Sequence, residues 1–139
     1  MSPPAPTNRE LEILKLLWRR ERATVREIYD DLKPNEPGLA YTTVLSLLQI
    51  MEHKGLVGHE QSGKAYIYFA RVKRESTLAG LARGFLDSVF DGAVGEYVAR
   101  ALDSQRPSLE ELEQIERMIA GAKQQARKDI PPRRKRRTK

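Results

Sequence analysis

The chain has 139 residues, of which 40% are hydrophobic and 32% charged, with a mean hydropathy of −0.59 and a formal net charge of +6. This length suits one compact domain, or a small domain with an appendage. The chain contains no cysteine, which excludes disulfides and thiolate metal sites. Its two histidines are too few for a histidine-based metal site unless carboxylates or a second chain contribute, so we expect no metal or other cofactor.

No apolar run approaches the roughly 18–20 residues that a membrane-spanning helix needs. The Pro-rich start, residues 1–6, lacks the basic and apolar regions of a signal peptide, and we expect it to be disordered. The sequence therefore predicts a soluble, cytoplasmic protein with no membrane insertion.

The positive charge is unevenly distributed. Residues 1–74 carry 12 Lys/Arg and 9 Asp/Glu, residues 75–126 carry 5 and 9, and residues 127–139 carry 8 and 1. The short C-terminal stretch therefore supplies more than the whole excess. This pattern indicates separate roles for the three parts, and only the front and the tip are suited to approach a polyanion.

Three Ser/Thr-x-x-Glu patterns, at residues 7–10, 24–27 and 108–111, stand just before helical spacing. Such a capping box satisfies two backbone N–H groups reciprocally at a helix start. The patterns predict helices from residue 7 to about 20, from 24 to about 32, and from 108 to about 127. Their apolar stripes are Leu11, Leu14, Leu17 and Trp18; Val25, Ile28 and Leu32; and Leu112, Ile115, Ile119 and Ala122.

A loop with two prolines and a glycine, residues 33–38, leads to a helix predicted from about Tyr41 to Lys54 and closed by Gly55. Two β-prone runs, residues 56–61 and 65–70, flank a three-residue link, which is a hairpin signal. In the second run, two tyrosines share one face and an isoleucine and a phenylalanine share the other. One of these pairs should pack on the helices. The buried face of the helix is Val44, Leu47, Leu48 and Met51.

Two more helical patterns follow, from about Arg74 to Phe90 and from about Val94 to the region before Pro107. Asp91-Gly92 separates them. Beyond Asp129 the chain is basic and Pro-containing, cannot bury a core, and is expected to be disordered.

The order helix, helix, capped helix, hairpin is the layout of a winged helix-turn-helix, in which one helix enters the DNA major groove. The helix at 41–54 has small polar side chains suited to that groove, and the hairpin tip and the start of the second helix could hold phosphates. The candidate DNA-binding residues are Thr24, Tyr41, Thr42, Thr43, Leu45, Ser46, Gln49, Lys54 and Lys64.

Two other interpretations of this front region remain open. Serines and threonines near a helix start are more often caps or solvated surface than base-reading groups. A minority of winged helices contact proteins rather than DNA, and the net charge of +3 over residues 1–74 is modest. A regulator that senses a small ligand between its domains is a further alternative, although no convergent polar pocket can be recognised in the sequence.

The helices of residues 75–126 carry more apolar side chains than short isolated helices can hide. A twofold dimer would bury them and place a second reading helix about one DNA turn, 34–36 Å, away. The alternative is a monomer in which these helices fold back on the front. The candidate dimerisation residues are Leu81, Phe85, Val89, Phe90, Val94, Tyr97, Val98, Leu102, Leu112, Ile115 and Ile119.

We therefore predict a mainly α protein with a small β-hairpin wing: a disordered start at 1–6, a winged-helix DNA-binding domain at 7–72, a helical dimerisation domain at 73–127 and a basic disordered tail at 128–139. The tail, with Arg133-Arg-Lys-Arg-Arg137, would bind any polyanion, or it could simply aid solubility. No cysteine nucleophile, glycine-rich phosphate loop or HExxH motif is present, so we predict that the protein is not an enzyme.

With these motifs in view, the chain resembles the penicillinase repressor family (BlaI/MecI-type transcriptional repressors) over about residues 6–125. The resemblance implies a homodimeric winged-helix repressor that binds a palindromic operator through the helix containing Thr42, Thr43 and Ser46. The motifs that carry it are Leu11-Glu-Ile-Leu-Lys-Leu-Leu-Trp18, Thr24-Val-Arg-Glu-Ile28, Ala40-Tyr-Thr-Thr-Val44, Lys54-Gly-Leu-Val57 and Gly63-Lys-Ala-Tyr-Ile-Tyr68.

Three departures from the family pattern stand out. Ile50 occupies a position where these repressors often carry an arginine. Antibiotic-responsive members are cut at an Asn-Phe bond by a membrane-bound metalloprotease sensor, and this chain has no Asn-Phe; the matching stretch is about Val98–Leu102. Either such a partner cuts another bond or induction works differently. Copper-responsive members use C-terminal cysteines, which this chain lacks, so that route to copper sensing is excluded.

Overall fold

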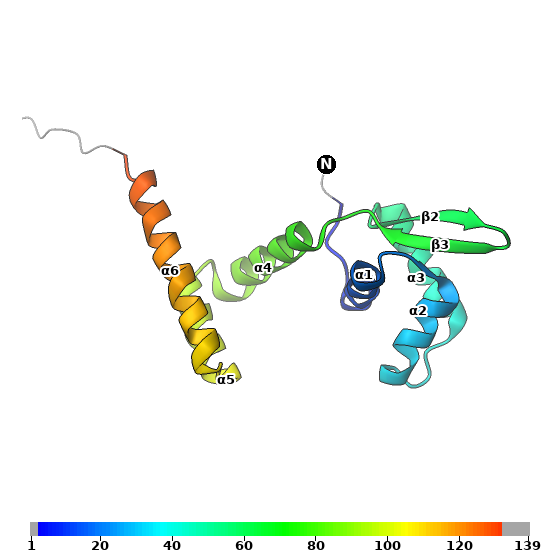
Figure 1. Cartoon of the computed structure of the whole chain (residues 1–139), viewed down its shortest axis with the longest axis horizontal. Helices are drawn as coiled ribbons and strands as arrows, with labels where there is room; N and C mark the ends of the chain where they lie inside the picture. The colour runs from blue at the N-terminus through cyan, green and yellow to red at the C-terminus, as the bar shows by residue number, and fades with distance from the viewer. Residues whose placement is uncertain (1–2, 132–139) are drawn as a thin grey trace, which may run out of the picture. The chain divides into compact units, whose positions relative to one another are not determined.

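The computed structural model describes residues 3–131, which form two compact units that divide between Gly92 and Ala93 (Figure 1). The first unit contains α1 (Asn8–Arg20), β1 (Ala23–Thr24), α2 (Val25–Leu32), the 3₁₀ turn η1 (Lys33–Asn35), α3 (Tyr41–Lys54), β2 (Val57–Ser62), β3 (Ala65–Ala70) and α4 (Arg74–Phe90). The second unit contains α5 (Val94–Gln105) and α6 (Leu109–Asp129). This division groups α4 with the front part of the chain, whereas the sequence placed a boundary after residue 72.

Capping boxes fix the starts of α1 and α2. The Thr7 hydroxyl accepts from the Glu10 backbone N–H at 3.3 Å, and a Glu10 carboxylate oxygen accepts from the Thr7 N–H at 2.8 Å. Thr24 and Glu27 make the same pair of bonds at 3.2 and 2.9 Å. The box predicted at the start of α6 is only half formed: Ser108 accepts from the Glu111 N–H at 3.1 Å, but no return bond is present.

The core of the first unit lies between α1, α2, α3 and the sheet. The face of α3 at Val44, Leu48 and Met51 is fully buried, and α3 ends at Gly55, whose φ of 85° is the left-handed conformation that glycine adopts without a steric penalty. The buried apolar residues that complete this core are Ile13, Leu14, Leu16, Leu17, Ala23, Val25, Ile28, Leu39, Leu56, Val57 and Tyr68.

The sheet is antiparallel with strand order β1-β3-β2, and β1 is a strand that the sequence analysis did not predict. Ala23 pairs with Tyr68, and Thr24 with Ile67. The hairpin turn has two residues between the strands rather than the three expected, because β2 continues through Ser62. A φ of 63° at Gly63 allows this tight turn.

The two faces of β3 carry Tyr66 and Tyr68 on one side and Ile67 and Phe69 on the other. The tyrosine face is the one that joins the core, and only Tyr68 does so. Tyr68 is 3% exposed, whereas Tyr66 is 46% exposed and lies farther along the hairpin. Ile67 and Phe69, on the other face, are half-buried.

The segment from Pro3 to Pro6 lies against the chain between the sheet and α4, where it lines a pocket of about 280 Å³. Of the start expected to be disordered, residues 3–6 are described and line this pocket together with Leu56 and Val72; residues 1 and 2 lie outside the described residues. The side chains that line the pocket with this segment are Leu56, Val72, Ser76, Thr77 and Leu81, beside Gly80.

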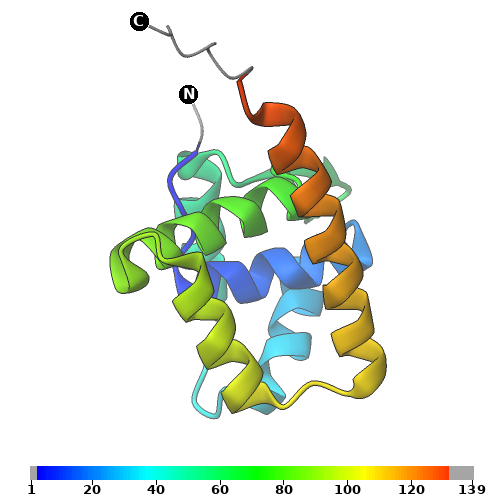
Figure 2. The same ribbon diagram turned by 90° about the vertical axis from the view of Figure 1, so that its left-hand side faces the viewer.

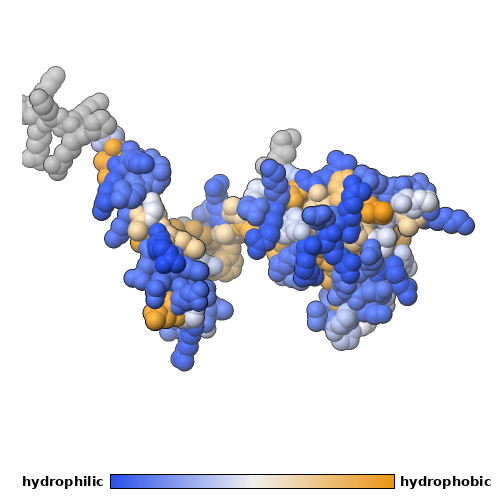
Figure 3. All heavy atoms as spheres, in the orientation of Figure 1, coloured by the Kyte–Doolittle hydropathy of each residue, from blue (hydrophilic) through white to orange (hydrophobic). Residues whose placement is uncertain are grey.

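Helices α4, α5 and α6 contain no buried residue, although each carries an apolar stripe. In the second unit, α5 and α6 run in opposite directions, joined by the segment around Pro107 (Figure 2). Apolar side chains are visible at the surface of both units among hydrophilic ones (Figure 3). The helix α6 continues to Asp129, so Lys128 and Asp129 belong to it rather than to the tail predicted from residue 128. Residues 132–139 lie outside the described part of the chain.

Candidate nucleic-acid interface

The outer face of α3 presents side chains of the size that a major groove accepts. Thr42, Ser46, Gln49, Ile50 and His53 are exposed, and they recur at helical spacing opposite the buried stripe. Because that stripe is packed in the core, the outer face has a fixed orientation. One face of α3 therefore packs in the core and stabilises the fold, and the opposite face is free to contact a ligand.

The first turn of α3 has no side-chain cap, and Tyr41 lies there with 41% of its surface exposed. Its ring meets that of Tyr29 from α2 edge-to-face, with centroids 5.8 Å apart. Thr43 is half-buried beside the exposed face. Leu45, a predicted DNA-binding residue, is half-buried and packs against the hydrophobic core, so the structure gives it a packing role.

Lys54, another predicted DNA-binding residue, is held inside the unit by Glu10. Its Nζ lies 3.0 Å from each carboxylate oxygen of Glu10, which is only 2% exposed. A buried carboxylate needs a cation and hydrogen bonds to offset lost hydration, and Lys54 supplies both. We therefore no longer count Lys54 among the candidate DNA-binding residues, because its ammonium forms an ion pair that joins the end of α3 to the start of α1.

Lys54 and Lys64 should consequently respond in opposite ways to replacement by methionine. We expect Lys54→Met to lower the free energy of unfolding by about 2 kcal/mol, because it leaves the Glu10 carboxylate buried without its cation. Lys64→Met, at the exposed hairpin turn, should change it by less than about 0.5 kcal/mol. Urea unfolding followed by circular dichroism measures both, and equal destabilisation by the two substitutions would refute the assignment.

Glu10 also makes the fold acid-sensitive. Burial alone raises the pKa of Glu10, but the hydrogen bonds from the Thr7 backbone and Lys54, with the Lys54 charge, outweigh it and hold the pKa below its ordinary value of 4.5. A carboxyl group whose pKa is lowered by folding stabilises the fold above the unfolded pKa, and this contribution is lost as the pH falls through the folded pKa.

We therefore expect the stability difference between the wild type and Glu10→Gln to be constant near neutral pH and to shrink as the pH falls below about 4.5. Urea unfolding at a series of pH values from 7 to 3 measures this difference. A difference that grows on acidification would contradict the assigned sign.

The predicted phosphate site at the start of α2 is occupied by the protein's own groups. The Thr24 hydroxyl accepts from the Glu27 N–H, and the Glu27 carboxylate accepts from the Thr24 N–H. That carboxylate supplies negative charge where an anion would bind. The Thr24 side chain is thus a helix cap in this structure, and the phosphate-binding role predicted for it loses its support.

Seven of the 13 Lys and Arg side chains of the first unit form ion pairs within the unit, which the sequence could not reveal. Arg22, just before β1, donates from both terminal nitrogens to the carboxylate of Glu60 on β2, at 2.7 and 3.2 Å. The cations of this unit that form no ion pair within the described residues are Arg19, Lys64, Arg71, Lys73, Arg74 and Arg83. The other paired cations are Arg9, Lys15, Arg20, Arg26, Lys33 and Lys54.

The hairpin is also attached to the end of α3 through a histidine. The Nδ1 atom of His59 on β2 lies 2.6 Å from a carboxylate oxygen of Glu52, and its ring centroid lies 4.9 Å from that of Tyr66. These contacts connect the hairpin to α3 at an exposed position. No group of three or more His, Cys, Asp or Glu within residues 3–131 could hold a metal ion.

The sequence model of the penicillinase repressor family matches residues 6–121. The chain belongs to the penicillinase repressor family. It is 32% identical over 114 residues to the transcriptional regulator BlaI of Mycobacterium tuberculosis, covering 75% of this chain and 82% of that protein. It is 21% identical over 116 residues to the penicillinase repressor of Bacillus licheniformis, covering 84% and 90% of the two chains.

Solved structures of the family's DNA-binding domain give only weak overlaps with this chain. The solution structure of the DNA-binding domain of the repressor BlaI is 20% identical, with a TM-score of 0.48, and covers 52% of this chain and 88% of that one. The monomeric form of Bacillus licheniformis BlaI in complex with the blaP half-operator is also 20% identical, with a TM-score of 0.46, and covers 53% and 89%. The family assignment rests on the sequence match instead.

Membership of the penicillinase repressor family confirms the predicted resemblance and the mainly helical fold with a small β-hairpin. It also confirms the prediction that the protein is not an enzyme, because the relatives are named transcriptional repressors. Among residues 3–131, the structure has no helix long and apolar enough to cross a membrane.

None of the predicted dimerisation residues of this family member is fully buried in the single chain. Val89 and Val94 are 56% and 58% exposed. The predicted residues that are exposed are Phe85, Val89, Val94, Tyr97, Leu102 and Ile119, and those that are half-buried are Leu81, Phe90, Val98, Leu112 and Ile115.

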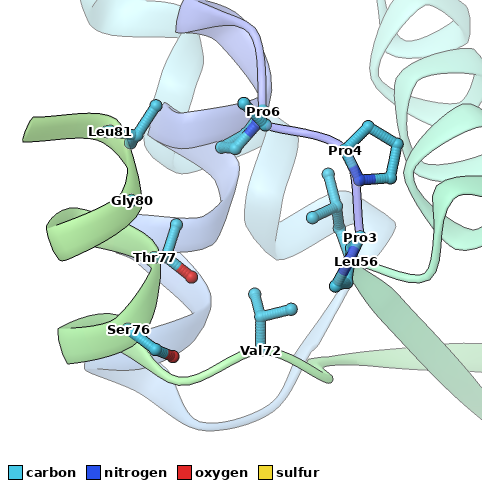
Figure 4. Close-up of a pocket in the computed structure, with 10 residues that line it drawn as sticks. Pro3, Pro4, Pro6, Leu56, Val72, Ser76, Thr77, Gly80 and Leu81 are labelled. Atoms are coloured by element: carbon cyan, nitrogen blue, oxygen red, sulfur yellow. The ribbon is translucent and has the colours of Figure 1, made fainter. Parts of the chain in front are cut away.

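The pocket beside Pro3–Pro6 lies within the first unit, and its lining bears on the alternative of a regulator that senses a small ligand (Figure 4). Its walls are largely apolar. The Ser76 hydroxyl donates to the Lys73 carbonyl of its own helix at 3.2 Å, so it is not directed to a ligand. This pocket therefore gives the ligand-sensing alternative no set of convergent polar groups.

Proposed function

We propose that this member of the penicillinase repressor family is a homodimeric transcriptional repressor that binds a palindromic DNA operator through α3. The observation that carries the proposal is the division of α3 into a fully buried face and an exposed face of small polar side chains. A helix so divided can lie in a groove about 12 Å wide without disturbing the core. Tyr41, Thr42, Thr43, Ser46 and Gln49 are the residues that we assign to this contact.

Electrostatics favour specific recognition over general attraction to phosphate. Seven of the 13 Lys and Arg side chains of the first unit already bind its own carboxylates, which reduces the positive charge that this unit offers to DNA. The exposed Lys64 at the hairpin turn is suited to a flanking phosphate. Binding that depends on few phosphate contacts should have a shallow salt dependence.

Helices α4 to α6 support the dimeric part of the proposal. None of them buries a residue, yet together they carry side chains such as Val89, Val94 and Ile119 at about half exposure or more. Removing such surface from water is favourable by about 25 cal/mol per Å², and a second copy offers a matching surface through a twofold axis. The symmetry of the dimer would be matched by a palindromic operator.

Relief of repression would follow from separating the two copies. A protease supplied by a sensor, such as a membrane-bound metalloprotease, or another signal could act on the exposed helices. The stretch Val98–Leu102, which the family resemblance singles out, lies inside α5. Cleavage there would require local unwinding of this helix, since a helical backbone cannot enter an extended protease cleft.

The proposal is tested by measuring binding of the full chain to its own upstream DNA and to a scrambled duplex at physiological salt. We expect saturable binding with a preference for the upstream DNA, which survives deletion of residues 130–139. Equal affinity for the two duplexes would contradict the proposal. Loss of all binding with the tail would favour the other candidate, a protein-interaction module whose tail binds nucleic acid nonspecifically.

A further inference from the structure

Ile50 is an apolar residue on an otherwise polar surface of α3. It is 50% exposed, and its neighbours on that face are Thr42, Ser46, Gln49 and His53. The core does not account for it, because the buried side of the helix already contains fully buried side chains. Isoleucine there cannot donate or accept a hydrogen bond.

The position of Ile50 on the helix places it within the proposed reading face rather than beside it. It follows Ser46 by four residues and Thr43 by seven, so the three side chains lie on neighbouring turns of one side of α3. Any groove wide enough to receive Ser46 would also receive Ile50. In a bound state, the exposed half of Ile50 would then face base edges.

Base edges in the major groove are hydrogen-bond donors and acceptors, with one apolar group among them, the 5-methyl group of thymine. An isoleucine over a donor or acceptor removes water from that group and gives it no partner, which is unfavourable. When the isoleucine lies over a thymine methyl group, the contact buries apolar surface of both the side chain and the methyl group. The chemistry of the residue therefore selects one base at its position.

We propose that Ile50 is a specificity-determining residue that contacts a thymine 5-methyl group in each half of the operator. This inference rests on the proposed function, because it requires α3 to lie in the major groove. It adds the chemical identity of one base in each half-site. The contact is uncharged, so its contribution should not change with salt concentration, unlike that of Lys64.

The test begins by selecting the preferred duplex from a random DNA pool with the full-length protein. Each thymine of that duplex is then replaced singly by uracil, which lacks the 5-methyl group and leaves the hydrogen-bonding edge unchanged. For the wild type, we expect one thymine in each half-site whose replacement weakens binding about fourfold, the value of one buried methyl-sized group. Replacing both should weaken it about 16-fold if the half-sites act independently.

Ile50→Ala should bind the thymine and uracil duplexes equally at those two positions. Because Ile50 is half-exposed, this substitution should leave the melting temperature nearly unchanged, which circular dichroism checks. Gln49→Ala, one residue away on the same face, is the matched control: it should retain the fourfold methyl effect even where it weakens binding overall.

The outcomes separate this inference from the proposed function. If a sequence is selected but uracil weakens the wild type and Ile50→Ala equally at every thymine, the assignment of Ile50 is overturned and the proposed function stands. If no sequence is enriched from the pool, the proposed function is overturned and the assignment of Ile50 with it.

Discussion

Replacing Ile119 by aspartate is expected to convert the protein to a monomer at micromolar concentration and to weaken operator binding about 100-fold or more. Ile119 lies on the apolar stripe of α6 and is 48% exposed in the single chain. Because a twofold interface uses each residue twice, one substitution removes two isoleucines. Burial of the exposed half of each contributes about 1 kcal/mol, and each new carboxylate would have to lose hydration.

The loss of DNA affinity follows from the loss of the dimer. Two linked reading helices bind as one molecule, so the second contact forms at a high effective concentration and raises affinity by roughly 10²–10⁴. A monomer retains a single contact. Sedimentation equilibrium measures the association state, and a titration with labelled operator measures affinity.

Gln114→Asp provides the matched control for this experiment. Gln114 lies on the same helix, away from the apolar stripe, and the substitution adds the same charge. We expect it to remain dimeric. A wild type that sediments as a monomer, or an Ile119→Asp variant that sediments as the wild type does, would refute dimerisation through α6.

Replacing Ser46 by glutamate is expected to abolish sequence-specific binding, with at least a 100-fold loss of affinity, and to leave the fold intact. Ser46 is exposed in the middle of the outer face of α3. In a groove bordered by phosphates, a carboxylate would be repelled, and its extra bulk would hold the helix away from the bases. Thr43→Ala should weaken binding more modestly, because it removes one hydroxyl and one methyl group.

Ser104→Glu, an exposed position in α5, adds the same side chain far along the sequence from α3 and should bind the operator as the wild type does. Melting curves of both variants should agree with the wild type to within a few degrees. Wild-type affinity of Ser46→Glu for the operator would show that α3 does not enter the groove.

Much of the local structure could be predicted because its causes lie close together in the sequence. The capping boxes at Thr7 and Thr24 involve residues three apart, and both form as predicted. The end of α3 depends on a single glycine at the position where φ is positive. Periodicity was sufficient to identify the buried face of α3, since three of its four predicted core residues are fully buried.

The features that sequence reasoning missed depend on partners far apart in the chain. Lys54 was predicted to bind DNA, whereas its ammonium binds a carboxylate partner that lies 44 residues earlier. The two-residue strand β1 exists only because β3 pairs with it. Its sequence, Ala-Thr, has no strand pattern of its own.

The charge of the front unit illustrates the same limit. A count over residues 1–74 gave a net of +3 and showed which side chains were available, but not which of them were paired. The structure shows Arg22 on Glu60 and Arg20 on Asp31, contacts that bring cations and carboxylates from different elements together. In the proposed complex, recognition through α3 would therefore depend on its small outer side chains more than on positive charge.

The central claim, that two copies of α3 read DNA side by side, is tested most directly by hydroxyl-radical footprinting of the full chain on its selected duplex. We predict two protected segments whose centres lie one helical turn apart, about 34–36 Å, or a whole number of turns, and which Ser46→Glu erases together. A single protected segment, or the same protection on a scrambled duplex, would contradict the claim.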